Sequence, residues 1–418
     1  MFEPLSTDPY KGVRDFYPAD WARLGGMFVR IRETLLAWGY EEYNASPLER
    51  AELYEAKTSE EIVNEQTYIF TDRGDRRVTL RPEMTPTLAR MVAGKRRELA
   101  FPLRWFSIGN RFRYERPQRG RLREFYQADV DIIGLPEGEA DIEIVRLASE
   151  ILKAFGATEK DFVIRVNSCA LLNAACKAAG LKGDAVRQYL RLLDKKSKMT
   201  PEAFKAARES ISTKDPLSLI EPKAMEPFVR GLKECGVSNV VFDASITRGF
   251  DYYTGMVFEI FDTDPANPRA MFGGGRYDGL VALFGGEQIP AVGFAIGEVT
   301  LDNFLETHGL TPKEDGDKPQ LYLGTPSARD IPAAQAFADM LRKEGCRVFV
   351  NLTNRPLGDQ VKDAVKRSIP FFVAYGADEV ANKTMHLKTL ATGEEIHLPV
   401  SELPSYLQSS FKSPAFSL

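Results

Sequence analysis

The chain has 418 residues, of which 44% are hydrophobic and 27% are charged, and its formal net charge is −4. These values are typical of a globular protein with two or three domains, and they exclude an overall basic surface that would attract nucleic acid unaided. The first residues lack the features of a signal peptide, no apolar run could span a membrane, and the four cysteines are scattered. We therefore expect a cytoplasmic protein without disulfides or a membrane segment.

The three histidines, His308, His386 and His397, all lie in the carboxy-terminal part of the chain. Any chemistry in the amino-terminal part must then proceed without histidine as general base, proton relay or metal ligand. Electrostatic catalysis on a nucleotide by arginines and Mg²⁺ needs no histidine. The sequence leaves that class of reaction open.

The amino-terminal part begins with an amphipathic helix. An apolar stripe predicts this helix from Trp21 to Trp38, with Asp20 as its N-cap. A strand is expected at 40–45, and a hairpin with strands at 68–70 and 78–80 follows.

Thr85 and Pro86 open the next predicted helix, Thr85 as its cap and Pro86 as its first residue. Glu83 lies just before this helix, where Arg81 is the nearest residue in sequence that could pair with it. The plain interpretation is a cap and a turn. The functional one, which we favour, is that Glu83 holds the ammonium group of a ligand.

The most informative stretch runs from Trp105 to Gly134, where alternating residues predict a long β-hairpin with a connection at 116–122. Residues of the same parity share one face of a strand. One face therefore gathers Arg111, Arg113, Glu115, Arg123, Phe125, Gln127, Asp129 and Asp131. The other face is apolar and is expected to be buried. A solvated charged face is the alternative, but guanidinium forks, a ring, an amide and carboxylates together favour a floor for a ligand with a phosphate and a base.

Beyond the hairpin we expect a helix at 141–155, a strand at 162–166 and a mostly helical insertion over about 170–235. The lysines near residue 196 could contact RNA phosphates or belong to an ordinary solvated surface.

Further strands are expected at 240–243, 256–261 and 291–297, the last of them entering a helix. Arg248, Tyr252 and Tyr253 lie between the first two. The glycine run 273–275 would let the backbone approach a ligand closely.

Residues 305–319 are polar and rich in Gly and Pro, which predicts a linker after a first domain of residues 1–304. Beyond the linker, strands are expected at 321–324, 348–350 and 371–375, and helices at 331–344 and 357–367. This alternation predicts a small α/β domain with a mostly parallel sheet over residues 320–418.

Four segments resemble the histidyl-tRNA synthetases, a family of class II aminoacyl-tRNA synthetases: KGVRDFYP (11–18), RPEMTPTLAR (81–90), RFRYERPQRGRLREFYQ (111–127) and RGFDYYTG (248–255). The third resembles motif 2 of the class, and AVGFAIG (291–297) resembles the start of motif 3. The resemblance implies an α+β catalytic domain with an antiparallel sheet, followed by an α/β domain like those that bind anticodons. It also implies a homodimer, because the first helix and strand resemble motif 1.

The resemblance implies that ATP, with Mg²⁺, activates L-histidine as histidyl-adenylate, and that histidine is then transferred to the 3′ end of tRNA(His). Catalysis would depend on Arg113 and Arg248. ATP would be bound by Arg113, Glu115, Phe125, Arg121 and Arg276. Histidine would be bound by Glu83, Thr85, Gln127, Asp131, Tyr252 and Tyr253.

The sequence departs from the family pattern in two places. Val299 and Thr300 stand where the family usually has Glu-Arg, so one expected phosphate contact is missing, and Arg276 or an arginine of the hairpin connection (Arg116, Arg121) would have to compensate. Asp131 stands where the family often has the longer Glu. The first departure keeps an alternative open, a non-catalytic regulatory paralogue that senses histidine beside ATP phosphoribosyltransferase. Against that alternative stand the motif 2 residues and the anticodon-binding-like domain.

Overall fold

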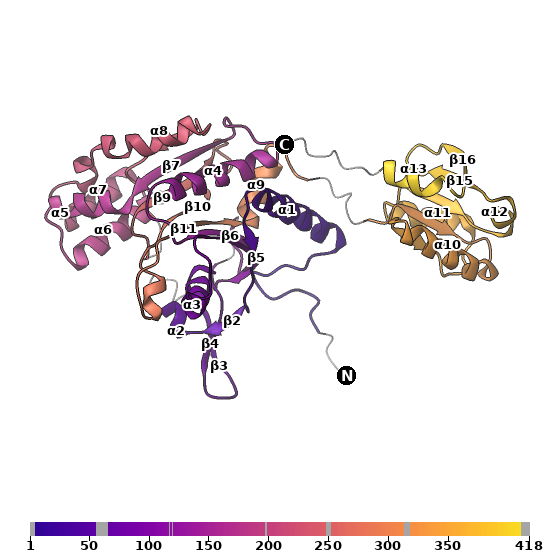
Figure 1. Ribbon diagram of the computed structural model, residues 1–418, viewed down its shortest axis with the longest axis horizontal. Coiled ribbons are helices and arrows are strands. Elements are labelled where there is room, and N and C mark those ends of the chain that lie inside the picture. The colour runs from indigo at the N-terminus through magenta and orange to yellow at the C-terminus, as the bar shows by residue number, and fades with distance from the viewer. Residues whose placement is uncertain are drawn as a thin grey trace. The chain divides into compact units, whose positions relative to one another are not determined.

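The computed structural model describes residues 5–55, 66–116, 118, 120–196, 199–247, 252–312 and 318–410. The chain divides into two compact units, Met1–Pro312 and Lys313–Leu418, here called the large unit and the small unit (Figure 1).

The large unit is built on a sheet whose described strands number eight, in the order β1-β5-β6-β11-β10-β9-β7-β8. The strands are β1 (Glu41–Glu42), β5 (Leu103–Phe112), β6 (Glu124–Ile133), β7 (Phe162–Ser168), β8 (Val240–Phe242), β9 (Met256–Asp262), β10 (Ala270–Arg276) and β11 (Ala291–Gly297). Neighbouring strands are antiparallel except β1 with β5 and β7 with β8. This confirms the α+β fold with an antiparallel sheet.

Strands β5 and β6 form the predicted hairpin, and its two faces separate as the alternation predicts. Arg111 lies opposite Phe125, and Ser107 lies opposite Asp129. The apolar face packs in the main core against α1 (Pro18–Ala37), α4 (Glu139–Ala154) and α9 (Glu298–Thr307). The opposite face of the sheet is left to the cavity described below.

The glycine run lies in β10, in the middle of the sheet. A Cβ on Gly274 would lie 1.9 Å from the carbonyl oxygen of Gly293, and one on Gly273 would lie 2.2 Å from that of Phe258. Real Cβ atoms do not come so close, so the neighbouring strands can approach β10 only because these residues are glycines. The run therefore serves strand packing, which the sequence interpretation did not anticipate.

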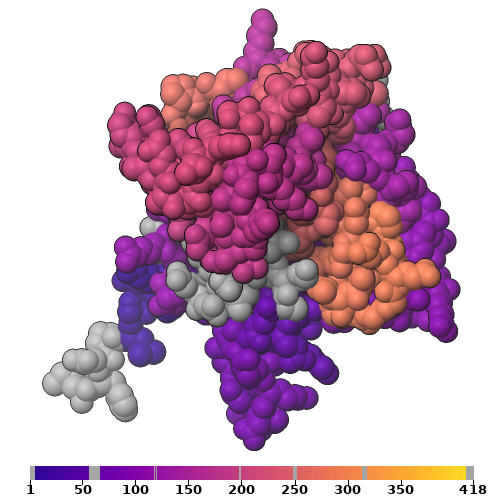
Figure 2. Space-filling view, turned by 90° about the vertical axis from the view of Figure 1, so that its left-hand side faces the viewer, coloured from indigo at the N-terminus to yellow at the C-terminus, as the bar shows by residue number. Residues whose placement is uncertain are grey.

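The predicted helical insertion is confirmed. It contains α5 (Cys169–Ala178), α6 (Asp184–Asp194), α7 (Pro201–Ile211), 3-10 helices at Pro216–Leu219 and Pro222–Met225, and α8 (Glu226–Glu234). Its helices share a separate core that includes Leu172, Tyr189 and Leu193. The insertion forms one end of the large unit, at the left of Figure 1 and facing the viewer in Figure 2.

A second sheet of the large unit has the order β2-β4-β3 in the described chain. It comprises β2 (Leu48–Arg50), β3 (Tyr68–Thr71) and β4 (Arg77–Leu80), flanked by α2 (Glu52–Glu55) and α3 (Thr85–Lys95). The hairpin predicted at 68–80 is confirmed. A 3-10 helix, Val281–Phe284, packs against α3.

The small unit has a described sheet in the order β13-β12-β14-β15-β16. Its elements are β12 (Leu321–Gly324), α10 (Ile331–Lys343), β13 (Val348–Val350), α11 (Leu357–Lys366), β14 (Phe371–Ala374), α12 (Ala377–Asn382), β15 (Thr384–Thr389), β16 (Glu395–Pro399) and α13 (Leu403–Ser409), with a 3-10 helix at Ala328–Asp330. Helices α10 and α13 pack on one face and α11 on the other. The α/β interpretation holds, but β15 and β16 form an antiparallel hairpin, so the sheet is mixed and not mostly parallel.

Two predicted helix starts are wrong. The first helix begins at Pro18 with Tyr17 as N-cap, which leaves Asp20 in the first turn, because proline suits the first helical position. Thr85 is the first residue of α3 and not its cap, which is Met84. The predicted linker also starts too early, since α9 continues to Thr307, and residues 313–317 lie outside the described chain.

Candidate active site

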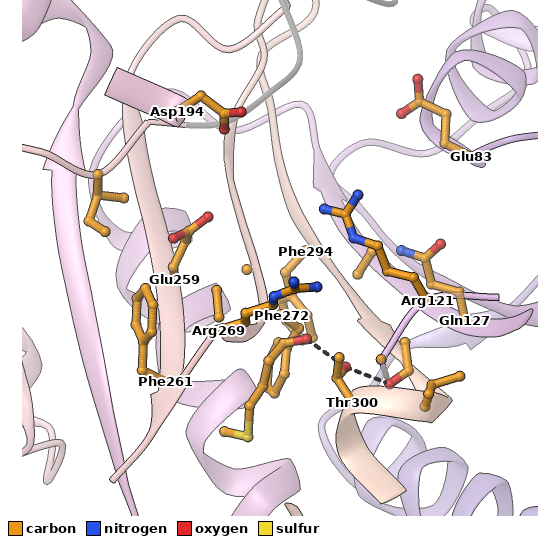
Figure 3. Close-up of a pocket in the computed structure, with 18 of the residues that line it drawn as sticks. Glu83, Arg121, Gln127, Asp194, Glu259, Phe261, Arg269, Phe272, Phe294 and Thr300 are labelled. Carbon is orange, nitrogen blue, oxygen red and sulfur yellow. Dashed lines mark hydrogen bonds between the residues drawn. The ribbon is translucent and has the colours of Figure 1, made fainter. Parts of the chain in front are cut away.

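One face of the large sheet forms the floor of a cavity of about 1360 Å³ (Figure 3). Four residues of β10 and β11 that line it are small: Gly273, Gly293, Ala295 and Gly297. Because these residues carry no side chain or a single methyl group, the floor is largely main chain. The space above it is left to a ligand, and larger side chains enter from the rim.

Glu83 lies in the wall of this cavity, immediately before α3, and its side chain is buried. The hydroxyl of Tyr252 donates a hydrogen bond of 2.8 Å to Glu83 Oε2. Burial, and then the charge of Glu83, raise the pKa of Tyr252 well above its ordinary value. Tyr252 therefore keeps its proton and remains a hydrogen-bond donor. Thr85 lines the same wall of the cavity. A carboxylate in this position can accept hydrogen bonds from a ligand ammonium group.

Asp131 lies on β6 and is buried under the cavity floor. Its carboxylate accepts a hydrogen bond from the hydroxyl of Tyr277. The pKa of Asp131 is raised to about 8, chiefly by burial. The bond from Tyr277 opposes this rise, and the charge of Asp129 adds to it. Asp129 itself is paired with the fully buried Arg111, at 2.5 Å. Asp131 can therefore change its protonation state near neutral pH.

Tyr277 belongs to a cluster of three tyrosine rings. The ring of Tyr252 lies 4.8 Å from that of Tyr253 and 5.8 Å from that of Tyr277, centroid to centroid. All three line the cavity. Such rings with polar tips suit a planar ligand that forms hydrogen bonds at its edge.

The hairpin supplies the next part of the wall. Arg113 Nε donates to the carbonyl oxygen of Pro82 at 3.0 Å, and its guanidinium carbon lies 5.3 Å from the centroid of the Phe125 ring. Burial lowers the pKa of Arg113, and the charge of Glu83 opposes this shift. The Oε1 atom of Gln127 is buried and finds no hydrogen-bond partner among the described residues. An acceptor in that state calls for a donor from a ligand.

At the end of the hairpin, Arg121 Nη1 lies 2.9 Å from Glu115 Oε2. Both residues line the cavity, and Figure 3 shows the guanidinium of Arg121 turned into it. Arg116 is exposed and does not line it.

Arg276 was expected to bind ATP in the cavity, but it lies in the protein core. It is 1% exposed and does not line the cavity. Its donors bind both carboxylate oxygens of Asp141 (2.7 and 2.9 Å), Asp278 Oδ1 (3.0 Å) and the carbonyl oxygens of Leu135 and Pro136 (3.1 Å each). A guanidinium has five N–H donors. All of them are used within the protein, so Arg276 holds β10 to the start of α4 and is not available to ATP phosphates.

The other predicted site residues, apart from Arg248, line the one cavity: Glu83, Thr85, Arg113, Glu115, Arg121, Phe125, Gln127, Asp131, Tyr252 and Tyr253. Arg248 lies outside the described residues. Tyr277 and Arg269, for which no role was expected from the sequence, line the cavity too. Tyr277 could have been noticed because it lies two residues after the glycine run, whereas Arg269 lies in a polar turn without any motif.

The described residues contain no group of three or more His, Cys, Asp or Glu side chains arranged for a metal ion. Among the described helices, none is long and apolar enough to cross a membrane.

A family model described as histidyl-tRNA synthetase matches residues 12–202 and 197–301, and one described as an anticodon-binding domain matches residues 321–410. A curated histidine–tRNA ligase from Leptospira biflexa is 39% identical over 425 residues, covering 96% of this chain and 97% of the relative. One from Opitutus terrae is 37% identical over 433 residues, covering 96% and 98%.

Among solved structures, the histidyl-tRNA synthetase from Nostoc sp. PCC 7120 aligns with a TM-score of 0.78 at 23% identity, covering 97% of this chain and all of that chain. An ATP phosphoribosyltransferase regulatory subunit/histidyl-tRNA synthetase from Bacillus halodurans aligns with a TM-score of 0.67 at 24% identity, covering 84% of this chain and 93% of that chain. At these sequence identities both alignments show similarity of fold alone.

Proposed function

The chain belongs to the histidyl-tRNA synthetase family, and on this premise we propose that it is a histidine–tRNA ligase whose chemistry takes place in the cavity on the large sheet. The ligase activates L-histidine with ATP and then transfers histidine to the 3′ end of tRNA(His). One observation carries the assignment of the cavity: ten of the predicted site residues, far apart in sequence, line it together.

In the first step, a carboxylate oxygen of histidine attacks the α-phosphorus of ATP, and the bond from that phosphorus to the pyrophosphate oxygen breaks. The two reactants are both anions, so the protein must screen their repulsion. We assign this role to Arg113, whose position against Phe125 would place it between the adenine and the reacting groups. Arg248 shares the role by resemblance to the family.

The hairpin residues would hold the nucleotide. Phe125 would stack on adenine, Glu115 would accept from its exocyclic amine, and Arg121 would bind phosphate oxygens. Glu115 and Arg121 form an ion pair, so both groups lie at the same end of the hairpin.

Glu83, Thr85 and Gln127 would hold the α-amino group of histidine, and Asp131 would read its imidazole together with Tyr252 and Tyr253. The observations that support this are the buried carboxylate of Glu83, the Gln127 oxygen without a partner among the described residues, and the tyrosine cluster whose member Tyr277 bonds Asp131. An amino acid without a ring N–H would leave the Asp131 carboxyl without its ligand partner, and such a loss strongly disfavours binding.

Mg²⁺ would enter as part of the substrate MgATP. Magnesium at nucleotide sites keeps several waters and needs only one or two protein carboxylates in addition to the phosphates. The lack of a dedicated acidic cluster in the described chain fits this mode.

The small unit would bind the anticodon of tRNA(His), in keeping with its family match at residues 321–410. We also propose a homodimer in which α1 takes part, because this helix leaves Trp21, Val29 and Leu36 about half exposed. A cytoplasmic location is consistent with the four cysteines, none of which forms a disulfide.

The regulatory paralogue is the second candidate, because Thr300 replaces a family arginine. It is disfavoured, since the curated ligases match this chain over nearly its whole length, anticodon-binding unit included. The test is histidine-dependent exchange of pyrophosphate into ATP by the full chain without tRNA. We expect exchange with histidine and none with glutamine or asparagine. Histidine binding without exchange would instead support the regulatory function.

A further inference from the structure

The cavity lining around Thr300 lacks the arginine that the family usually has at this position. Thr300 is in the first turn of α9, and its hydroxyl donates to the carbonyl oxygen of Met271 at 2.7 Å (Figure 3). A Cβ on Gly120 would lie 3.8 Å from Thr300 Cγ2, so the hairpin connection packs directly beside it. Thr300 is thus engaged with neighbouring protein, and its short neutral side chain cannot bind a phosphate as a guanidinium would.

Arg269 enters the cavity beside this position. It precedes β10, two residues before the Met271 carbonyl that Thr300 binds, and it lines the cavity. Figure 3 shows its guanidinium pointing into the space near Phe272, with Arg121 reaching in from the other side. Arg269 therefore projects into the region where a side chain from position 300 would otherwise act.

The contacts of Arg269 distinguish it from other arginines of the cavity. Arg121 is paired with Glu115 at 2.9 Å, and Arg165 with Asp243 at 3.2 Å. For Arg269, the contact found within the described chain is with the neutral amide of Gln118, at 3.3 Å. A long hydrogen bond to a neutral group is weaker than an ion pair and is easily exchanged for a bond to an anion.

We propose that Arg269 binds the β- and γ-phosphates of ATP and the departing pyrophosphate, in place of the arginine that Thr300 has lost. This inference rests on the proposed ligase function. As the bond between the α-phosphorus and the pyrophosphate oxygen breaks, negative charge gathers on the leaving group, and a planar guanidinium can bind two of its oxygens at once. Arg121 binds the same group from the hairpin connection, so the phosphates lie between one arginine that precedes β10 and one from the connection between β5 and β6.

The experiment is the exchange assay with purified full-length Arg269→Ala, Arg269→Lys and a control, Arg230→Ala. Arg230 is 73% exposed in its side chain, lies on α8 and does not line the cavity. We expect Arg269→Ala to lower kcat/KM for ATP and for pyrophosphate by about tenfold to a hundredfold relative to the control. Arg269→Lys should lie between the two, because it keeps the charge but not the two-pronged contact.

Three further readouts test whether the effect is limited to the terminal phosphates. AMP lacks them, so its inhibition constant against ATP should be the same in Arg269→Ala and the control. The dissociation constant of histidine and the single-turnover transfer from preformed histidyl-adenylate to tRNA should also be unchanged, because pyrophosphate takes part in neither.

The inference is overturned if Arg269→Ala exchanges pyrophosphate as well as Arg230→Ala does. It is equally overturned if binding of AMP or histidine weakens as much as that of pyrophosphate. A wild-type protein that binds histidine but supports no exchange would instead refute the ligase function itself, so the two failures are distinguishable.

Discussion

Replacing Asp131 with Asn tests the electrostatics of the cavity floor directly. Asp131 is 3% exposed, and burial raises its pKa from the usual 3.8 to about 8. Between these two values the folded protein binds a proton at Asp131 that the unfolded chain does not bind. Folding therefore takes up a proton, and this residue makes the protein less stable as the pH rises toward 8. Asn has nearly the same shape and no such proton.

The size of the effect follows from the two pKa values. The free energy of unfolding falls by about 1.4 kcal/mol per pH unit while a full proton is taken up, and by half as much at the folded pKa. From pH 6 to pH 8, the free energy of unfolding of the wild-type protein should thus fall by about 2 kcal/mol more than that of Asp131→Asn.

Urea titration followed by tryptophan fluorescence measures this difference. Trp21, Trp38 and Trp105 are the tryptophans of the chain, and all belong to the large unit, so the signal reports the unfolding of that unit alone. Both proteins are measured without histidine at pH 6 and pH 8. A stability difference between wild type and variant that is the same at both pH values would refute the raised pKa.

Two other substitutions test the packing around the cavity. In Gly293→Ala, the new Cβ would lie 2.0 Å from Asp131 Oδ1, so we expect the carboxyl group to be displaced. The KM for histidine should then rise at least about tenfold in the exchange assay. An unchanged KM would contradict the assignment of Asp131. Arg276→Ala leaves the buried Asp141 unpaired and should lower the free energy of unfolding by about 3–5 kcal/mol, measured in urea, with KM for ATP unaltered in the folded protein. If Arg276→Ala instead raised the KM for ATP and left the free energy of unfolding unchanged, Arg276 would be a nucleotide ligand after all.

The sequence predicts well what depends on local periodicity. Alternation along 105–134 separates the core-facing side of the hairpin from the side that carries Gln127 and Asp131, because side-chain direction in a strand follows from parity alone. Arg111 and Arg123, expected on the ligand face, do not line the cavity: Arg111 is fully buried and paired with Asp129, and Arg123 lies over the ring of Tyr114. The hairpin of β15 and β16 was missed, since its outward side chains, such as His386 and His397, are polar and exposed and leave a weak apolar signal.

Contacts between distant segments lie beyond such patterns. Arg276 was expected to bind phosphate in place of the arginine missing at Thr300, and only the fold shows that Asp141 meets it in the core. The same holds for Tyr277 and Asp131, which lie on different elements and meet through strand pairing. Arg269 carries no local signal at all, because its importance comes from its position beside Thr300.

The small residues on the cavity floor have a consequence for engineering this site. Where Gly273, Gly293, Ala295 and Gly297 line the cavity, the ligand faces peptide groups, whose chemistry no substitution alters. At Gly273 and Gly293 a replacement would also push neighbouring strands apart, because a Cβ would lie 2.2 Å from the carbonyl oxygen of Phe258 and 2.6 Å from that of Val130, respectively. Enzymes that accept histidine analogues should therefore be sought by varying rim residues such as Tyr253, with the floor kept as it is.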